Sequence, residues 1–373
     1  SDVCSSDLTV SVKGGGAVTI DNTLNAVSST GTTMTSVILD GVDANSEIKG
    51  QGLTDVTVKG VTTAARTVEI TNTKADHALT VNVDGTGYDA AGTEKQTTVK
   101  DANATAITVN ASGDKSSLDL TGSVEAKSLN ITGDAALTLN ASGLTKLTTI
   151  DGSAATGDLT LGTLNDATVN VNTGSGDDTF TIAATAKVAV DAGAGDDTVT
   201  LGAAIAAGST INLGAGDDTV TLGAAIAAGS TINLGAGDDT VTLGAAIAAG
   251  STINLGAGDD TVTLGAAIAA GSTINLGAGD DALLTDGGSV AASAVIDGGD
   301  GFDTVSAALI NAGNAAQFHN FEALNLSSSS SPVTLDVDLL THSTIEALTL
   351  SGGNQAATVS NVAAGVNLLV SGQ

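Results

Sequence analysis

The chain has 373 residues, enough for two or three average domains, and a net charge of −30 from 41 acidic and 11 basic residues. Only five residues are aromatic, whereas 48 are glycine, and there is one cysteine and no tryptophan. This composition excludes a nucleic-acid-binding surface, which needs a basic face, and a disulfide framework, which needs paired cysteines. The composition also differs from that of disordered chains, because 42% of the residues are apolar and only 14% are charged.

The acidic charge is unevenly distributed along the chain. Every Lys and Arg lies at or before Lys187, so the net charge is −11 up to this residue and −19 beyond it. Unneutralised carboxylates repel one another and destabilise a compact state. The second half of the chain must therefore be disordered or hold cations.

Residues 1–8 read SDVCSSDL and resemble the translation of a sequencing adapter. We expect them to be an artefact, and Cys4 with them. The pattern of the chain also stops in mid-course at Gln373, so we expect a fragment at both ends. The lack of a signal peptide consequently says nothing about localisation.

Residues 9–172 alternate polar and apolar side chains in short runs, which is the pattern of half-buried β-strands. They are predicted to form a β-solenoid region without calcium motifs. From about residue 105 the runs recur about every ten residues, two per turn. Residues 84–104, with Tyr88 and a run of charges, interrupt the pattern and are predicted to be a loop. The predicted strands are 17–20, 55–58, 67–70, 79–83, 106–109, 128–131, 137–139, 159–161 and 169–171.

Residues 173–306 contain identical 21-residue copies of GAGDDTVTLGAAIAAGSTINL, and repeats of this length are typical of solenoids. Four full copies begin at Gly193, Gly214, Gly235 and Gly256, and a fifth begins at Gly277 and diverges after Asp281. The runs TVTL and TINL alternate like half-buried strands, so stacked copies would form continuous aliphatic columns. Because such a core is thin, small side chains suffice. We predict an all-β, parallel β-solenoid of about 20–21 residues per turn.

The segment GAAIAAG within each copy is too short for a helix, since marginal helices need about 12–15 residues. The uncharged stretch 198–216 is not a transmembrane segment, because Gly, Ser, Thr and Asn interrupt it and Asp pairs bound it. We predict that this arm adds a third short strand and a more triangular cross-section.

Residues 307–373 are predicted to be a C-terminal region of further strands at 333–335, 347–350 and 367–369, with a break at 327–331. Phe318 and Phe321 are expected to plug or cap the core. Within the copies, Thr219 and Thr221 should point outward if Val220 points inward. A column of asparagines is expected to form a hydrogen-bonded ladder. It consists of Asn212, Asn233, Asn254 and Asn275.

Seven acidic loops carry the candidate chemistry. Five read GAGDD, GSGDD precedes them, and GGDGFD follows, with second glycines 19, 21, 21, 21, 21 and 22 residues apart. Stacking places like charges about 4.8 Å apart, at a cost of roughly 3 kcal/mol per pair at an effective dielectric of 20. Calcium would bridge them, because it accepts six to eight oxygens in flexible geometry, whereas magnesium demands a strict octahedron.

These loops resemble the repeats-in-toxin (RTX) nonapeptide, Gly-Gly-x-Gly-x-Asp-x-apolar-x. Residues 298–306 match every specified position; the other six loops have Thr173, Ala192 or a leucine in place of the first glycine. The resemblance implies a right-handed β-roll or β-helix, with Ca²⁺ bound between neighbouring loops on one edge only, up to six ions from seven loops. The implied ligands are Asp178, Asp197, Asp218, Asp239, Asp260, Asp281 and Asp303. The preceding acids are ligands or only charge donors: Asp177, Asp196, Asp217, Asp238, Asp259 and Asp280. The glycines that shape the loops are Gly174, Gly176, Gly193, Gly195, Gly214, Gly216, Gly235, Gly237, Gly256, Gly258, Gly277, Gly279, Gly299 and Gly301.

The flanking regions resemble, in composition, bacterial surface-layer proteins and large adhesins exported by type I secretion. This likeness implies a calcium-dependent structural protein of the cell surface, a surface-layer subunit or an adhesin stalk. Calcium is the implied partner, with self-assembly or a cell-surface polysaccharide as further partners.

Two alternatives stay open. One is a calcium-dependent ice-binding solenoid, suggested by the Thr-x-Thr arrays. The other is the non-catalytic part of an RTX secreted enzyme. No HExxH or Gly-x-Ser-x-Gly motif occurs, and the three histidines His77, His319 and His342 are scattered, so we predict no enzyme activity in this chain.

Overall fold

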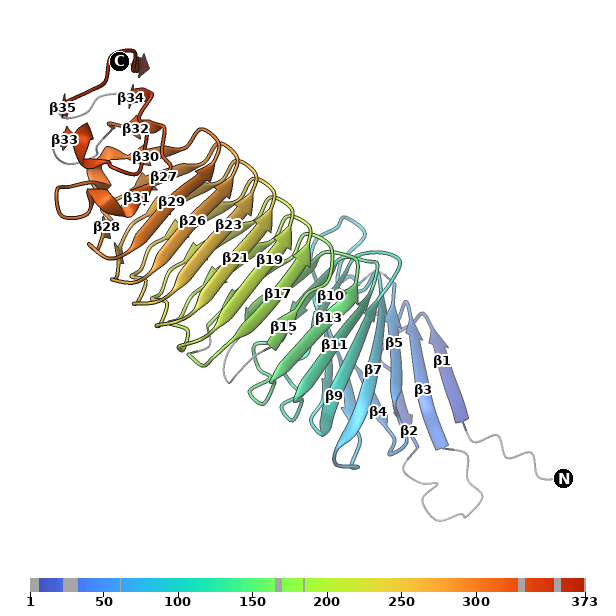
Figure 1. The fold of residues 1–373 in the computed structure, drawn as a ribbon. Helices are drawn as coiled ribbons and strands as arrows, with labels where there is room; N and C mark the ends of the chain where they lie inside the picture. Colours follow the sequence, from blue (N-terminus) through green and yellow to red (C-terminus); the bar gives the residue numbers. More distant parts are fainter. Residues whose placement is uncertain are drawn as a thin grey trace. The chain divides into compact units, whose positions relative to one another are not determined.

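The structure is a computed structural model that describes residues 7–22, 33–60, 62–164, 170–183, 185–327, 333–351 and 357–371. The chain divides into two compact units, residues 1–186 and 187–373. In both units the strands run parallel and stack turn upon turn, as Figure 1 shows. The prediction of an all-β, parallel β-solenoid is thereby confirmed.

Unit 1 consists of two parallel sheets whose strands alternate along the chain. The first sheet contains β1 (Asp7–Lys13), β3 (Thr33–Asp40), β5 (Asp55–Lys59), β7 (His77–Asp84), β9 (Ala104–Ala111), β11 (Ser128–Gly133), β13 (Thr149–Ala155) and β15 (Asn170–Asn172). The second contains β2 (Thr19–Asp21), β4 (Ser46–Lys49), β6 (Arg66–Thr71), β8 (Thr97–Asp101), β10 (Ser116–Asp119), β12 (Leu137–Asn140), β14 (Leu159–Leu164) and β16 (Thr179–Ile182). Each turn of the chain thus gives one strand to each sheet.

The predicted loop at 84–104 is wrong in part. Residues 97–101 form β8, which pairs with β6 and β10, and the true loop covers residues 85–96. Thr97, Val99 and Asp101 of β8 are buried, and the residues between them face outward. The alternation was present in the sequence, but the charges around it concealed it.

Unit 2 has the same plan with a more regular register. The first sheet contains β17 (Ala189–Ala194), β19 (Thr210–Ala215), β21 (Thr231–Ala236), β23 (Thr252–Ala257), β26 (Thr273–Ala278), β29 (Val295–Asp300) and β31 (Phe318–His319). The second contains β18 (Thr198–Leu201), β20 (Thr219–Leu222), β22 (Thr240–Leu243), β24 (Thr261–Leu264), β27 (Ala282–Thr285), β30 (Thr304–Ser306), β32 (Ala323–Asn325), β34 (Ala347–Ser351) and β36 (Asn367–Ser371). Two short pairs are β25 (Ala267–Ile268) with β28 (Ser289–Val290), and β33 (Val333–Asp336) with β35 (Ala357–Ser360).

The helices of the described residues are three short 3₁₀ turns, η2 (Ala307–Leu309), η3 (Ala315–Gln317) and η4 (Val337–Leu339). No helix in these parts of the chain is long and apolar enough to cross a membrane. The predicted break at 327–331 lies almost wholly outside the described residues.

The core of unit 2 consists of aliphatic columns in which each residue stacks on its own copy. Val220 pairs with Val241, Ile232 pairs with Ile253, and all four are 0–1% exposed. Burial of this kind contributes about 25 cal/mol per Å². The thin core therefore forms without aromatic residues, as the composition required. Phe318 and Phe321 plug it after the last acidic loop, fully buried with ring centroids 6.3 Å apart.

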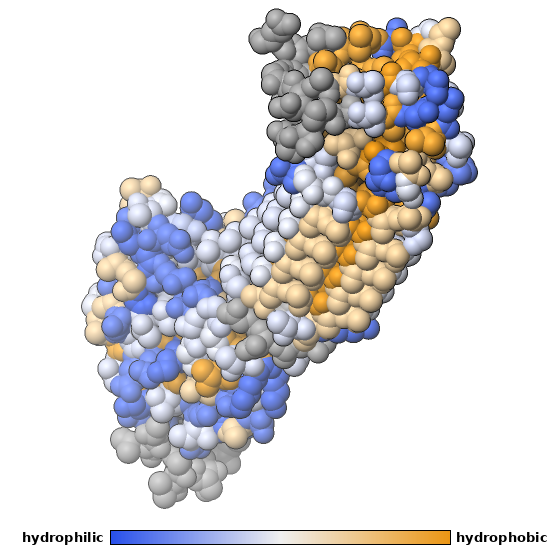
Figure 2. All heavy atoms as spheres, turned by 90° about the vertical axis from the view of Figure 1, so that its left-hand side faces the viewer, coloured by the Kyte–Doolittle hydropathy of each residue, from blue (hydrophilic) through white to orange (hydrophobic). Residues whose placement is uncertain are grey.

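The arm GAAIAAG lies at the edge opposite the acidic loops, where the predicted third short strand occurs as single β-bridges and as the two-residue strand β25. Ile205 bridges Ile226, which bridges Ile247, and these isoleucines are 1–2% exposed. The arm carries no charge, and Ala225 and Ala246 are exposed on its surface. Figure 2 shows an apolar band that crosses successive turns. Each repeat therefore separates its charges onto one edge and leaves the other apolar.

The predicted asparagine ladder forms on the first sheet of unit 2. The side chain of Asn233 donates to Asn212 Oδ1 at 2.8 Å, and that of Asn254 donates to Asn233 Oδ1 at 2.9 Å. Thr219 and Thr221 face outward and Val220 faces inward, also as predicted.

Candidate metal centre

Each of the seven acidic loops joins a strand of the first sheet to the next strand of the second. The loop at 174–178 joins β15 to β16 in unit 1, and the other six lie in unit 2. The flanking strands pair residue for residue, with Gly214 opposite Gly235 and Gly235 opposite Gly256. The six loops of unit 2 therefore stack on one edge.

The two glycines of each loop all have positive φ, from 98° at Gly174 to 143° at Gly279 and Gly301. Only glycine adopts such angles at low cost. The spacing between turns adds a second requirement at Gly237, where a Cβ atom would lie 2.5 Å from the carbonyl carbon of Gly216. The stack can therefore close only through residues without side chains.

The second Asp of each loop points into the protein. These inner aspartates are 0–1% exposed, although they carry ionisable carboxyl groups. From Asp218 to Asp303, each Oδ1 accepts the backbone N–H of the inner Asp one turn earlier. The donor–acceptor pairs are Asp197–Asp218, Asp218–Asp239, Asp239–Asp260, Asp260–Asp281 and Asp281–Asp303, each at 2.8 Å.

The other carboxylate oxygen distinguishes this column from an ordinary hydrogen-bonded ladder. Oδ2 is buried and has no hydrogen-bond partner in Asp218, Asp239, Asp260, Asp281 and Asp303. A buried carboxylate oxygen without a partner costs the desolvation energy of the group, which is large for a charge. A column of five such atoms therefore requires a proton or a cation at each turn.

Burial also changes the acidity of these groups. It raises the pKa of Asp218 to about 6 and that of Asp239 and Asp260 to about 7, because the charged form loses its water. Neighbouring carboxylates raise each pKa further. Burial likewise raises the pKa of Asp281, and that of Asp303 to about 6. In unit 1, burial raises the pKa of Asp178 to about 6.

In the five GAGDD loops of unit 2 the first Asp lies exposed on the edge, and these residues form a second ladder of opposite direction. Asp217 N–H donates to Asp196 Oδ1 at 2.8 Å, and Asp238 N–H donates to Asp217 Oδ1 at 2.8 Å. The same bond recurs at Asp259, at Asp280 and at Phe302, with distances of 2.7–2.9 Å. These outer aspartates thus accept backbone bonds as well as supplying charge.

Two further acidic residues, which the sequence analysis missed, accept backbone bonds of the same kind within their own units. In unit 1, Asp158 Oδ1 accepts the N–H of Asp177 at 3.0 Å. In unit 2, Glu322 Oε2 accepts the N–H of Asp303 at 2.9 Å. Each lies 19 residues from its partner, so the turn spacing was the available signal.

The residues that replace the first glycine of the RTX pattern belong to the core. Leu213, Leu234, Leu255 and Leu276 are all 0% exposed, and Ala192 is equally buried. Their side chains fill the solenoid, so the substitution removes no oxygen atom from the loop. Leucine or alanine in place of glycine therefore adds buried apolar surface at each of these turns.

The donor set fits a hard cation with many oxygen ligands. Among the described residues, no three His, Cys, Asp or Glu side chains converge to hold a metal ion. A cation at this edge would therefore draw on the inner Asp Oδ2 atoms together with backbone carbonyls and water. Calcium accepts such mixed sets, whereas softer metals favour Cys and His.

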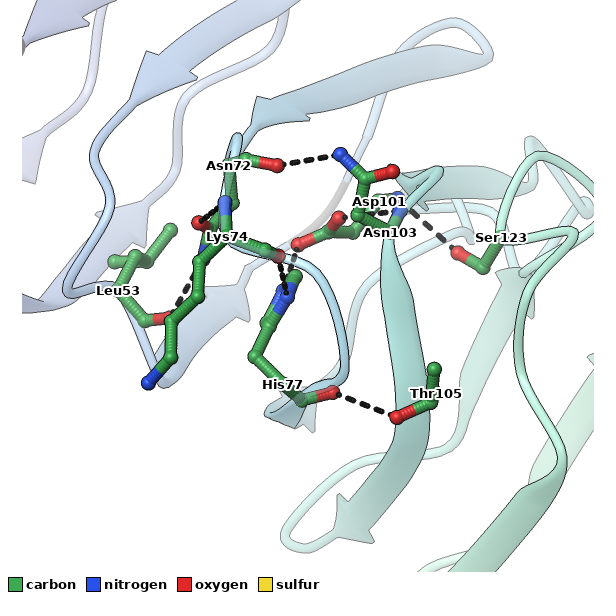
Figure 3. Close-up of polar contacts among 8 residues, drawn as sticks. All are labelled: Leu53, Asn72, Lys74, His77, Asp101, Asn103, Thr105 and Ser123. Carbon is green, nitrogen blue, oxygen red and sulfur yellow. Dashed lines mark hydrogen bonds and ion pairs between the residues drawn. The ribbon is translucent and has the colours of Figure 1, made fainter.

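His77, in unit 1, takes part in a buried hydrogen-bond network. His77 Nδ1 lies 2.8 Å from the carbonyl oxygen of Lys74, and Nε2 lies 2.8 Å from Asp101 Oδ2 (Figure 3). Asp101 in turn accepts the N–H of Asn103 at 3.1 Å, and its own N–H donates to Ser123 Oγ. Both ring nitrogens are engaged in this buried network, which joins consecutive turns.

A polar hollow of about 500 Å³ lies elsewhere in unit 1. Its two carboxylates, Glu47 and Glu69, stand opposite each other on β4 and β6. Each forms an ion pair at 3.0 Å, Glu47 with Lys49 and Glu69 with Lys100. These carboxylates are exposed and neutralised, unlike those of the inner column.

Comparison of the chain with protein-family models, with curated proteins and with solved structures finds no match.

Proposed function

We propose that the chain is a calcium-dependent structural protein of the bacterial cell surface, without catalytic activity, in which calcium ions bridge the stacked acidic loops. One observation carries the proposal: the column of buried, unpartnered Oδ2 atoms from Asp218 to Asp303. Bound Ca²⁺ would offset both the desolvation and the mutual repulsion of these carboxylates. The repeat without calcium would be destabilised by the same charges.

The proposed secretion and cell-surface location follow from this dependence of folding on calcium. A chain whose second half has a net charge of −19 would stay unfolded where calcium is scarce and would fold where calcium is abundant. This behaviour suits secretion in the unfolded state and an extracellular location. The regular repeat supports a spacer or lattice role, because turns can be added without changing their neighbours.

The test is a calcium titration of the full chain by isothermal calorimetry, with far-UV circular dichroism in excess chelator as the structural measurement. The matched variants are D260N, inside the column, and D286N, an exposed acid outside the loops with the same charge change. In D260N the amide oxygen can still accept the N–H of Asp239, so this hydrogen bond is retained and only the charge is removed. We expect D260N to bind less calcium and D286N to bind as the parent does. An unchanged spectrum in chelator, with no heat of binding, would contradict the proposal.

A second candidate is an ice-binding face, supported by the register of the threonines. Thr219 pairs with Thr240 and Thr221 with Thr242, so two threonine columns run along the second sheet of unit 2. Threonine is also an ordinary outward-facing strand residue. Thermal hysteresis of the full chain in calcium would support the ice-binding role, and its absence would exclude it.

A further inference from the structure

The acidic column does not end with the last Gly-Asp loop. Thr304 pairs with Ala323, which pairs with Ala347, so Glu322 and Glu346 stand one and two turns beyond Asp303. Glu322 Oε2 accepts the N–H of Asp303 at 2.9 Å, as each inner Asp accepts that of its predecessor. Glu322 therefore takes the next position of the inner column, although no Gly-Asp motif precedes it.

At this end of the column, Asp303 has a buried carboxylate oxygen without a hydrogen-bond partner. Asp303 is 0% exposed, its Oδ1 accepts the N–H of Asp281, and its Oδ2 is buried without a hydrogen-bond partner. This Oδ2 lies 2.6 Å from the place where a Cβ atom on Gly298 would be, and the carbonyl oxygen of Asn320 lies close to the same place. Two oxygens thus meet beside Gly298.

Gly298 is the only first glycine among the loops of unit 2, which makes this meeting possible. It stands where Leu276 stands one turn earlier, between the paired residues Asn275–Asp297 and Gly277–Gly299. A side chain there would overlap both oxygens. On the far side, Asn320 has a φ of 54°, a left-handed conformation that asparagine adopts more often than most residues.

We propose that Glu322 and Asp303 form a further Ca²⁺ site, between the last Gly-Asp loop and the turn that follows it. This inference rests on the proposed calcium function. The protein ligands would be Asp303 Oδ2, the second oxygen of Glu322 and the carbonyl oxygen of Asn320, with water completing the shell. Two carboxylates match the charge of one divalent ion, and calcium tolerates carbonyl and water ligands in irregular geometry. This loop has no outer aspartate, because Phe302 occupies the outer position and donates its N–H to Asp280.

The site is tested with the full chain, by counting bound calcium in native mass spectrometry for the parent, E322Q and E346Q. In E322Q the amide oxygen can still accept the N–H of Asp303, and E346Q makes the same charge change one turn beyond. We expect E322Q to hold one calcium fewer per chain and E346Q to hold as many as the parent. An unchanged count in E322Q, beside a reduced count in D260N, would overturn this site and leave the proposed function intact.

A spectroscopic measurement separates this site from the rest of the column. The chain has no tryptophan, and Phe302 is 41% exposed beside Asp303, so F302W places a single indole at this end of the column. Excitation of the indole sensitises the emission of Tb³⁺ bound nearby in place of Ca²⁺. We expect E322Q in the F302W background to lower the emission and D260N to leave it unchanged. Equal emission with and without E322Q would refute the site, and no binding of either ion to any variant would refute both proposals.

Discussion

Gly237→Ala should destabilise the repeat far more than Gly250→Ala, although both replace a glycine of positive φ in the same copy. At Gly237 φ is 136°, and a Cβ atom would lie 2.5 Å from the carbonyl carbon of Gly216 and 3.0 Å from the amide nitrogen of Asp217. The backbone strain costs about 1–3 kcal/mol, and the overlap costs about 1–3 kcal/mol more. We therefore expect a loss of about 4 kcal/mol of local stability.

Gly250 provides the control. Its φ is 72°, and no atom lies within 4 Å of the position of a Cβ atom. Only the left-handed conformation is penalised, at about 1–2 kcal/mol. The difference between the two variants therefore isolates the close approach of neighbouring turns from the conformational preference of glycine.

The assay is hydrogen exchange of the full chain in calcium, measured by mass spectrometry. Stacked repeats unfold through their neighbours and not as one unit, so a local readout is needed. The new alanine marks the peptide of the altered turn, and the identical peptides of the other copies serve as the internal reference. We expect exchange of the marked peptide to accelerate about 1,000-fold in Gly237→Ala and about tenfold in Gly250→Ala. Equal acceleration in both variants would refute the role assigned to the close stacking of the loops.

Three further predictions concern the core and the carboxylates. Leu255→Ala removes a side chain that is 0% exposed and should lower the local stability measured by hydrogen exchange by about 2–5 kcal/mol. Thr221→Ala on the surface should lower it by less than about 1 kcal/mol, and similar losses in both variants would contradict the core assignment. Burial raises the pKa of Asp239 and Asp260 from 3.8 to about 7, so the native state holds more protons than the unfolded state between these pH values. In chelator, the urea concentration at the midpoint of unfolding should therefore fall between about pH 5 and about pH 8, and a midpoint that rises with pH would contradict the prediction. For the same reason protons compete with calcium, and the calcium affinity measured by calorimetry should fall below about pH 6; a pH-independent affinity would exclude these carboxylates as ligands.

The fold could be predicted because two features of the sequence determine which side chains are buried and which residues stack. The alternation in TVTL and TINL set which side chains are buried, and the 21-residue period set which residues stack. Val220 on Val241 and the bond from Asn233 to Asn212 both follow from that period. The period is looser in unit 1, and there β8 was missed because charges surround a short alternating run.

The position of the candidate site was predictable, but its inner structure was not. The spacing of the loops indicated that the aspartates stack on one edge. It did not reveal that Asp218 is 1% exposed whereas Asp217 is exposed, because that depends on how the chain leaves Gly216. Asp158 and Glu322 were missed because they lack the complete glycine pattern and accept their backbone bonds only through the register of the neighbouring strands.

The central claim is that calcium neutralises the buried column of aspartates. Calorimetric titration of the full chain with calcium, against magnesium in a parallel titration, tests it most directly. We expect several calcium ions to bind, about one per step between neighbouring loops, with fewer bound in D260N and no comparable binding in the magnesium titration. Calcium binding that is absent, or that is the same in the parent and in D260N, would contradict it.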